Sequence, residues 1–266
     1  MRFTRPAVMG ILNVTPDSFS DGGRFLEPHA AVEHGLRMQS EGAALIDVGG
    51  ESTRPGADPV SPAEELRRVI PVIEGLSDRL DIPISVDTRR ATVARAALEA
   101  GVSFVNDVSA LRSDPALAEV VAEAGADVCL MHMQGEPKTM QERPRYEDVV
   151  SEVKSFLEER LAFATSSGIP EAAVWLDPGI GFGKTAEHNL ELLRRLDEIA
   201  RIGRPVVVGA SRKRFIGAIT GRPEEERVAG SLGAAVIAFE RGATMFRVHD
   251  VAQSRDALAV AAATLI

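Results

Sequence analysis

Short apolar runs alternate along the chain with longer segments that have the spacing of amphipathic helices. Eight runs predict strands, and they cover residues 8–12, 45–48, 84–86, 104–106, 128–131, 174–177, 206–210 and 245–249. Most runs are unbroken rather than alternating, which is typical of parallel strands covered on both faces. At or just after its end, each run meets a polar residue with useful chemistry, and these are Asn13, Asp47, Asp87, Asn106, His132, Asp177, Ser211 and His249.

The repeated order of strand, helix and connection predicts an α/β protein built as a single (β/α)8 TIM barrel over residues 1–266. The active site is then expected at the C-terminal ends of the strands. An open doubly wound sheet is the competing topology, but no reversal of order signals it. Helix boundaries agree with the barrel: Ser61, Pro62 and Glu64 predict a capping box, while Gly42 and Gly101 fall where helices should end.

Two connections are long, polar and rich in Gly and Pro, and they cover residues 14–27 and 133–146. Connections of this length in a compact domain are usually functional or mobile. The segment 49–60 adds flexible glycines and an arginine beside the same expected site. We expect segments 14–27 and 49–60 to fold over a bound substrate, although the sequence does not define their order or closure.

Composition narrows the class of protein. Of the 266 residues, 45% are hydrophobic and 26% charged, which is ordinary for a globular enzyme. The net charge is −9 with scattered basic residues, so no nucleic-acid partner is expected. A lone Cys129 inside an apolar run predicts a buried, inert thiol and leaves no intramolecular disulfide. No signal peptide or membrane-length apolar run is present, so we expect no membrane partner and a cytoplasmic location.

A polar residue after a strand often caps the next helix. For three of the strand-end residues another feature of the sequence takes over that role, which leaves their side chains for a ligand. Thr88 follows Asp87, a glycine-rich stretch separates Asp177 from the next helix, and Asp114 marks the helix start after Asn106. The two carboxylates and one amide suit a flat heterocycle with N–H donors, because these side chains accept paired hydrogen bonds. Carboxylates can equally bind a divalent metal, and the spacing does not separate the two.

A cationic group is expected at the end of the last two strands. Arg247 and His249 lie two residues apart in a strand, so their side chains point to the same face. Arg212 and Lys213 follow the preceding strand. In barrels of this kind, anionic groups often bind at the loops after strands 7 and 8, so an anion site is favoured over a surface salt bridge.

The run from Gly179 to Lys184 is not a nucleotide-binding loop, because Pro178 stands where a P-loop requires its first glycine. We interpret it as a turn that places Phe182 beside a planar ligand. No HExxH zinc motif or GxSxG nucleophile elbow occurs. Asp47 and His132 receive no role from the sequence.

Seven segments together resemble the bacterial dihydropteroate synthase family over nearly the full length of the chain. They are GILNVTPDSFSDGG at 10–23, DVGGESTRPG at 47–56, SVDT at 85–88, NDV at 106–108, DPGIGFGK at 177–184, GASRKRF at 209–215 and RVH at 247–249. The resemblance implies an enzyme that joins p-aminobenzoate to 6-hydroxymethyl-7,8-dihydropterin diphosphate, releasing pyrophosphate and 7,8-dihydropteroate for folate biosynthesis. It also implies an SN1-like mechanism, a homodimer and sensitivity to sulfonamides.

The resemblance further implies a role for particular side chains. The pterin would be held by Asp87, Asn106, Met131, Asp177 and Lys213. The diphosphate would meet Asn13, Thr53, Arg247 and His249, and Asn13 would bind Mg²⁺ as the cofactor. The p-aminobenzoate would lie among Thr53, Arg54, Pro55, Phe182, Ser211 and Lys213. The catalytic groups would be Asp87, Lys213, Arg247 and His249.

Two other functions fit parts of this pattern. A pterin-binding methyltransferase would share the carboxylates and the amide but would have no diphosphate to hold, so Lys213, Arg247 and His249 argue against it. A pterin-binding protein without catalysis would bind the heterocycle and release no pyrophosphate. For the homodimer, the alanine-rich segments 229–238 and 257–263 offer apolar contact, but they are equally suited to packing on the barrel.

Overall fold

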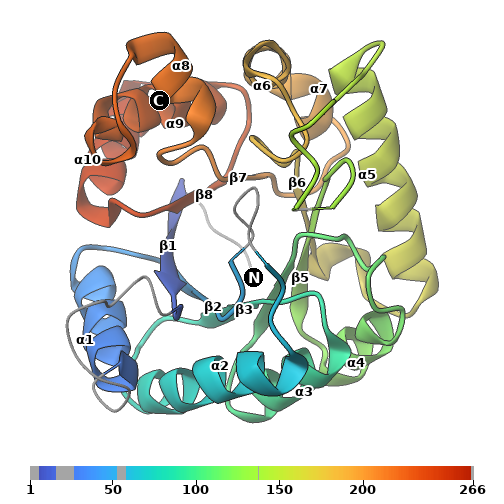
Figure 1. The fold of residues 1–266 in the computed structure, drawn as a ribbon, viewed down its shortest axis with the longest axis vertical. Coiled ribbons are helices and arrows are strands. Elements are labelled where there is room, and N and C mark those ends of the chain that lie inside the picture. The colour runs from blue at the N-terminus through green and yellow to red at the C-terminus, as the bar shows by residue number, and fades with distance from the viewer. Residues whose placement is uncertain (1–5, 16–26, 53–57, 137, 265–266) are drawn as a thin grey trace.

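The computed structural model describes residues 6–15, 27–52, 58–136 and 138–264, and it shows an eight-stranded parallel barrel wrapped by helices (Figure 1). The strands are β1 Ala7–Asn13, β2 Leu45–Gly49, β3 Ile84–Asp87, β4 Phe104–Asp107, β5 Asp127–Met131, β6 Val174–Asp177, β7 Val207–Val208 and β8 Met245–Val248. The helices are α1 Glu27–Ser40, α2 Pro62–Ser77, α3 Ala91–Glu99, α4 Ala116–Ala124, α5 Val149–Ser166, α6 Ala186–Arg194, α7 Leu196–Ala200, α8 Arg214–Thr220, α9 Val228–Glu240 and α10 Val251–Thr264. The predicted fold class is confirmed.

The barrel closes between β6 and β7, where the pairing is thinnest. The strand order runs β6-β5-β4-β3-β2-β1-β8-β7, and each neighbouring pair in it is parallel. Closure rests on a bridge between Leu176 and Val206 and on the amide of Leu176, which donates to the carbonyl of Pro205 at 2.9 Å. The run predicted as strand 206–210 forms β7 over only Val207–Val208.

Apolar side chains form two separate layers, one inside the barrel and one around it. The inner layer is a floor beneath the strand ends, made by Ala7, Met9, Leu45, Phe104, Cys129, Trp175, Val207 and Met245. Phe104 and Trp175 meet edge to face there, with ring centroids 5.7 Å apart. The outer layer packs the other face of the strands against the helices. Residues two positions beyond the floor therefore point into the barrel mouth, since side chains alternate along a strand.

Helix starts follow the sequence signals only in part. The Ser61 hydroxyl accepts from the Glu64 amide at 3.2 Å, as predicted, but the Glu64 carboxylate pairs with Arg67 and Arg68 instead of completing the box. At α3, the expected cap was Thr88. Instead, the Asp114 carboxylate accepts from the Ala91 amide at 2.8 Å, from the loop before α4.

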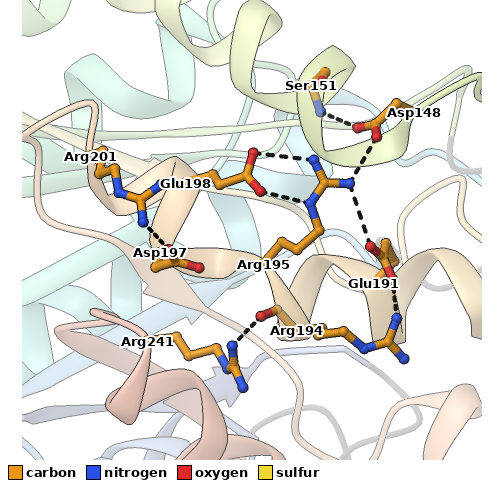
Figure 2. A network of polar contacts seen from close by, with 9 residues as sticks. All are labelled: Asp148, Ser151, Glu191, Arg194, Arg195, Asp197, Glu198, Arg201 and Arg241. Carbon is orange, nitrogen blue, oxygen red and sulfur yellow. Dashed lines mark hydrogen bonds and ion pairs between the residues drawn. The ribbon is translucent and has the colours of Figure 1, made fainter.

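Arg195 joins the helices that follow β5 and β6 (Figure 2). Its guanidinium donates to Asp148 at 2.8 Å and to Glu198 at 2.7 and 3.2 Å, and it lies 3.4 Å from Glu191. Asp148 also caps α5 by accepting from the Ser151 amide at 2.7 Å. This network fixes α6 and α7 relative to α5, behind the glycine-rich turn that enters the site. Within the described residues, no helix has the length and apolar character needed to cross a membrane.

Candidate active site

A cavity of about 950 Å³ opens at the carboxyl ends of the strands. Its walls collect side chains that are far apart in the sequence because parallel strands deliver their ends to one face of a barrel. Ten predicted site residues line it, namely Asn13, Asp87, Asn106, Met131, Asp177, Phe182, Ser211, Lys213, Arg247 and His249. Thr53, Arg54 and Pro55, with segment 16–26, lie outside the described residues.

Asp87, which is buried, and Arg247, which is partly buried, form an ion pair on one wall of the cavity. Nη2 of Arg247 lies 2.8 Å from Oδ2 of Asp87, and its Nε lies 2.6 Å from Oδ2 of Asp47. Burial raises the pKa of Asp87 to about 7, against the opposing effect of Arg247 and with a further increase from Asp47. The pKa of Arg247 is raised, since the two carboxylates outweigh the effect of its burial. Arg247 was predicted as a free anion-binding group, and the structure shows two of its nitrogens already paired.

Asp177 and Asn106 also have internal partners, although the sequence suggested that they were unengaged. Oδ1 of Asp177 accepts from the Gly179 amide at 2.6 Å, while the Asn106 amide donates to Asp47 at 3.0 Å. Burial raises the pKa of Asp177 to about 6, and the Gly179 hydrogen bond opposes this. Each side chain still offers at least one oxygen toward the cavity. The pair therefore keeps the acceptor character expected for binding N–H donors.

An apolar cluster lies beside these carboxylates, and four of its five members line the cavity. It consists of Val108, Met131, Met133, Met140 and Phe182. Methionine is flexible and polarizable, so it adapts well to the face of a ring. The cluster completes a pocket with acceptors at one edge and apolar contact across a face, which suits a planar heterocycle.

Lys213 and Phe182 form a second subsite at the cavity wall. Nζ of Lys213 lies 4.0 Å from the centre of the Phe182 ring, a cation–π distance. Gly181 lies against the same lysine, because a Cβ at Gly181 would come within 3.0 Å of the lysine Cδ. A cation held over an aromatic ring is suited to an aromatic carboxylate.

Another part of the cavity lining is formed by Ser211 and His249, together with Asn13. The Ser211 hydroxyl lies 3.1 Å from Nδ1 of His249 and accepts from the His249 amide at 3.3 Å. Arg212, which seemed available for an anion, instead pairs with Asp250 through two bonds of 3.0 and 2.5 Å. The cationic end of the site therefore has one arginine fewer for binding an anion than the sequence suggested.

The Asn13 side chain bears on the predicted magnesium site. It makes no hydrogen bond to the described part of the chain, so its oxygen is available as a ligand. Over the same residues, no cluster of three or more His, Cys, Asp and Glu side chains has metal-binding geometry. Mg²⁺ keeps several waters and is often held by one or two protein ligands together with substrate phosphates. The residues present fit that arrangement and do not form a cage made by protein alone.

The glycine-rich turn depends on Lys184, whose role the sequence did not reveal. Its buried ammonium donates to the carbonyls of Gly179 and Phe182, each at 3.0 Å, and lies 2.9 Å from Nδ1 of His132. A Cβ at Gly179 would come within 1.9 Å of the His132 carbonyl, and Gly179 has a φ of +67°. The lysine after the three glycines was the available signal, but the sequence predicted only a turn that places Phe182 beside a planar ligand and gave this lysine no role.

The barrel and its cavity define an enzyme class with chemistry at the strand ends, and the comparisons give the family. The sequence profile described as pterin binding enzyme matches residues 9–249. Dihydropteroate synthase of Escherichia coli (strain K12) is 50% identical over 262 residues, covering 98% of this chain and 93% of that protein.

Solved structures agree with these relatives. The Xanthomonas albilineans dihydropteroate synthase with 4-aminobenzoic acid is 52% identical, with a TM-score of 0.93, covering 98% of this chain and 94% of that one. The same enzyme in complex with 7,8-dihydropteroate is 49% identical, with a TM-score of 0.91, covering 100% of this chain and 95% of the other. The chain belongs to the dihydropteroate synthase family of pterin-binding enzymes, as its motifs predicted.

Proposed function

We propose that this protein condenses 6-hydroxymethyl-7,8-dihydropterin diphosphate with p-aminobenzoate to give 7,8-dihydropteroate and pyrophosphate. The observation that carries the proposal is the single cavity in which the carboxylates of Asp87 and Asp177 lie with the Lys213 and Phe182 subsite. The relatives described above bear the name of this activity, and their bound 4-aminobenzoic acid and 7,8-dihydropteroate match its substrate and product.

The pterin would occupy the pocket between the hydrogen-bond acceptors of the strand ends and the apolar cluster that contains Met131. Asp87, Asn106 and Asp177 would accept hydrogen bonds from its ring N–H groups, and Met131 would pack against its face. Burial strengthens these bonds, because the low local dielectric screens them less than water does. The same carboxylates would stabilise the positive charge that develops on the methylene carbon attached to the pterin ring once the leaving group departs.

The diphosphate would extend toward Asn13, Arg247 and His249, which all line the cavity. Two nitrogens of Arg247 are held by carboxylates, which leaves Nη1 as a fixed donor without a partner in the described chain. A preorganised cation of this kind stabilises the charge that develops as the C–O bond breaks. With Mg²⁺ bound to Asn13 and the diphosphate, the metal would supply further neutralisation of the leaving group.

The reaction would proceed in an SN1-like manner. The C–O bond to the diphosphate breaks, with its electron pair leaving on the diphosphate oxygen. The amine nitrogen of p-aminobenzoate then forms the new C–N bond, and the amine loses a proton to solvent. Lys213 and Phe182 would orient the aminobenzoate for this attack, and orientation alone can account for a large rate enhancement.

Coupled measurement of pyrophosphate release tests this function. The purified protein with the pterin diphosphate, p-aminobenzoate and Mg²⁺ should release pyrophosphate and form 7,8-dihydropteroate in equal amounts. Pterin binding without pyrophosphate release would identify a binding protein instead. Transfer of a methyl group to or from the pterin, with no use of p-aminobenzoate, would favour the methyltransferase alternative.

We further propose that the protein forms a homodimer through α9. The exposed stripe on this helix contains Ala229, Gly233 and Ile237, and Ile237 is 44% exposed. Small and apolar residues on one face allow close helix packing. Ile237→Glu should convert a dimer to a monomer in light scattering, while Leu190→Glu on α6 should not. A wild-type protein that is monomeric at micromolar concentration contradicts the proposal.

A further inference from the structure

Asp47 lies inside the barrel, beneath the cavity and out of contact with it. The residue is fully buried on β2, and it is not among the side chains that line the cavity. Two positions earlier on the same strand, Leu45 belongs to the apolar floor. Asp47 therefore lies between the floor and the ligand site, where a buried carboxylate is costly unless its oxygens are well paired.

Three strands supply the partners of this carboxylate. Oδ1 of Asp47 accepts from the Ser85 hydroxyl of β3 at 2.6 Å. Oδ2 accepts from the Asn106 amide of β4 at 3.0 Å and from Nε of Arg247 of β8 at 2.6 Å. A single carboxylate thus ties together two side chains that do line the cavity.

The contact determines which atom Asn106 offers to a ligand. A carboxylate can only accept hydrogen bonds, so the Asn106 nitrogen must point toward Asp47. If the amide turned over, two oxygens would face each other in a buried site. The Asn106 oxygen is therefore the atom left for the ligand, and it adds an acceptor beside Asp87 and Asp177.

The contact also fixes the plane of the Arg247 guanidinium. Asp47 holds Nε and Asp87 holds Nη2, at 2.6 and 2.8 Å. Two carboxylates on different strands leave a planar fork little freedom to rotate. With Asp87 alone, the guanidinium would retain one anchor and would turn about it.

We propose that Asp47 is a positioning residue for the site of the pterin diphosphate, acting through Asn106 on the pterin and through Arg247 on the diphosphate. It sets the amide of Asn106 with its oxygen toward the ligand and sets the guanidinium of Arg247 in one plane. This inference rests on the proposed function only for the identity of the ligand. The equally buried Asp107 shows the contrast, because its oxygens accept from Ser109 and Leu111 within its own turn.

Three variants separate positioning from other effects. Asp47→Ala removes the contacts to Asn106, Arg247 and Ser85, and we expect it to weaken binding of 6-hydroxymethyl-7,8-dihydropterin diphosphate at least about ten-fold in calorimetry. Asp47→Asn keeps an oxygen that can accept from both partners while removing the charge, and it should restore affinity to within about three-fold of wild type. Ser85→Ala removes only the third partner and should change affinity less than about two-fold.

The second substrate provides an internal comparison. The KM for p-aminobenzoate should stay within about two-fold of wild type in all three variants, because Asp47 contacts nothing in the Lys213 and Phe182 subsite. The proposal is overturned if Asp47→Ala binds the pterin like wild type. It is equally overturned if Asp47→Asn loses as much affinity as Asp47→Ala, or if both substrates weaken in parallel.

A measurement on the unaltered protein covers the case in which Asp47→Ala does not fold. The side-chain amide protons of Asn106, assigned by their loss in Asn106→Asp, should include one that exchanges slowly with solvent. Rapid exchange of both protons overturns the proposal. Failure of the wild type to release pyrophosphate would remove the proposed function and leave this result standing, so the two outcomes are distinguishable.

Discussion

Nζ of Lys184 lies 2.9 Å from Nδ1 of His132, and both side chains are buried behind the glycine-rich turn. Burial lowers the pKa of His132 to about 2, and the Lys184 charge adds to this, so the imidazole is neutral and accepts from the ammonium. Burial also lowers the pKa of Lys184 to about 7. His132, the polar residue that directly follows β5, therefore has a structural role: it supports the turn that carries Phe182.

Replacing Lys184 should loosen that turn. Lys184→Met leaves the carbonyls of Gly179 and Phe182 without their donor, so we expect the free energy of unfolding to fall by about 1–3 kcal/mol in urea. The KM for p-aminobenzoate should rise more than the dissociation constant for the pterin. Lys154→Met, on the surface of α5, is the matched control and should change neither.

The pH dependence of stability gives a second measure of the same change. The folded protein binds the Lys184 proton less tightly than the unfolded chain does, since an unperturbed lysine has a pKa of about 10.4. Between about pH 7 and 10 the unfolded chain thus carries more protons, and the lysine contribution to stability rises with pH. The stability difference between wild type and Lys184→Met should grow across this window. A difference independent of pH would show that the lysine is not held with a lowered pKa.

Asp87 should be required for pterin binding but not for folding. Asp87→Ala removes a buried acceptor, and Arg247 keeps its second carboxylate, Asp47. The loss of a hydrogen bond to a charged group costs about 1.5–3 kcal/mol, which raises the dissociation constant roughly 10- to 100-fold. Calorimetry with the pterin diphosphate measures this, and thermal melting checks the fold. Asp256→Ala on α10 is the control, and an unchanged affinity in Asp87→Ala would exclude the pterin assignment.

Pterin affinity and stability of the free protein should respond to pH in opposite directions. The pKa values of Asp87 and Asp177 are raised by burial to about 7 and about 6. As the pH falls toward 4, these two carboxylates bind protons in the folded protein before they do so in the unfolded chain. Their contribution to the free energy of unfolding therefore rises as the pH falls. Protonation removes acceptors, so affinity for 6-hydroxymethyl-7,8-dihydropterin should fall below about pH 6. Asp87→Asn should flatten this profile, and a wild-type affinity that is constant from pH 5 to 8 contradicts the assignment.

Sulfonamide analogues should compete with p-aminobenzoate. They would use the same contact between Lys213 and Phe182, where the cation lies 4.0 Å from the ring centre. Raising the p-aminobenzoate concentration should raise the inhibitor concentration that halves the rate in proportion. In Phe182→Ala, both the KM and the inhibition constant should increase, since each ligand loses the same stacking surface. Inhibition that is indifferent to p-aminobenzoate concentration would contradict a shared subsite.

The turn after β6 should not tolerate a side chain at Gly179. Gly179→Ala puts a Cβ against the His132 carbonyl and strains a backbone with a φ of +67°, so the loss of stability should exceed about 2 kcal/mol. Gly203→Ala is the control. Gly203 also has a positive φ of +87° but open space around its Cβ position, so only the backbone strain of about 1 kcal/mol remains. Equal losses in urea denaturation would show that the close approach does not exist.

The sequence predicted the barrel because each strand and its terminal polar residue are local features. It did not predict the roles of Asp47 and Lys184, because each has partners from distant segments of the chain: Asp47 pairs with Asn106 and Arg247, and Lys184 pairs with His132. Asp47 and Arg247 stand at opposite ends of the chain, yet β1 lies between their strands in the sheet. The cap of α3 was missed for the same reason, since Asp114 comes from the next connection along the sheet. Residue type alone does not specify which of several buried carboxylates faces the ligand.

The thin closure between β6 and β7 divides the catalytic mouth along a particular line. Asp177 ends β6 on one side of it, while Ser211 and Lys213 follow β7 on the other. Among the described residues, the backbone pairing across this line consists of the bridge between Leu176 and Val206 and the hydrogen bond from the Leu176 amide to the Pro205 carbonyl. Phe182 follows β6 and Lys213 follows β7, so their contact of 4.0 Å crosses the same line. The side-chain contact between Phe182 and Lys213 thus joins two edges of the barrel that few backbone hydrogen bonds join.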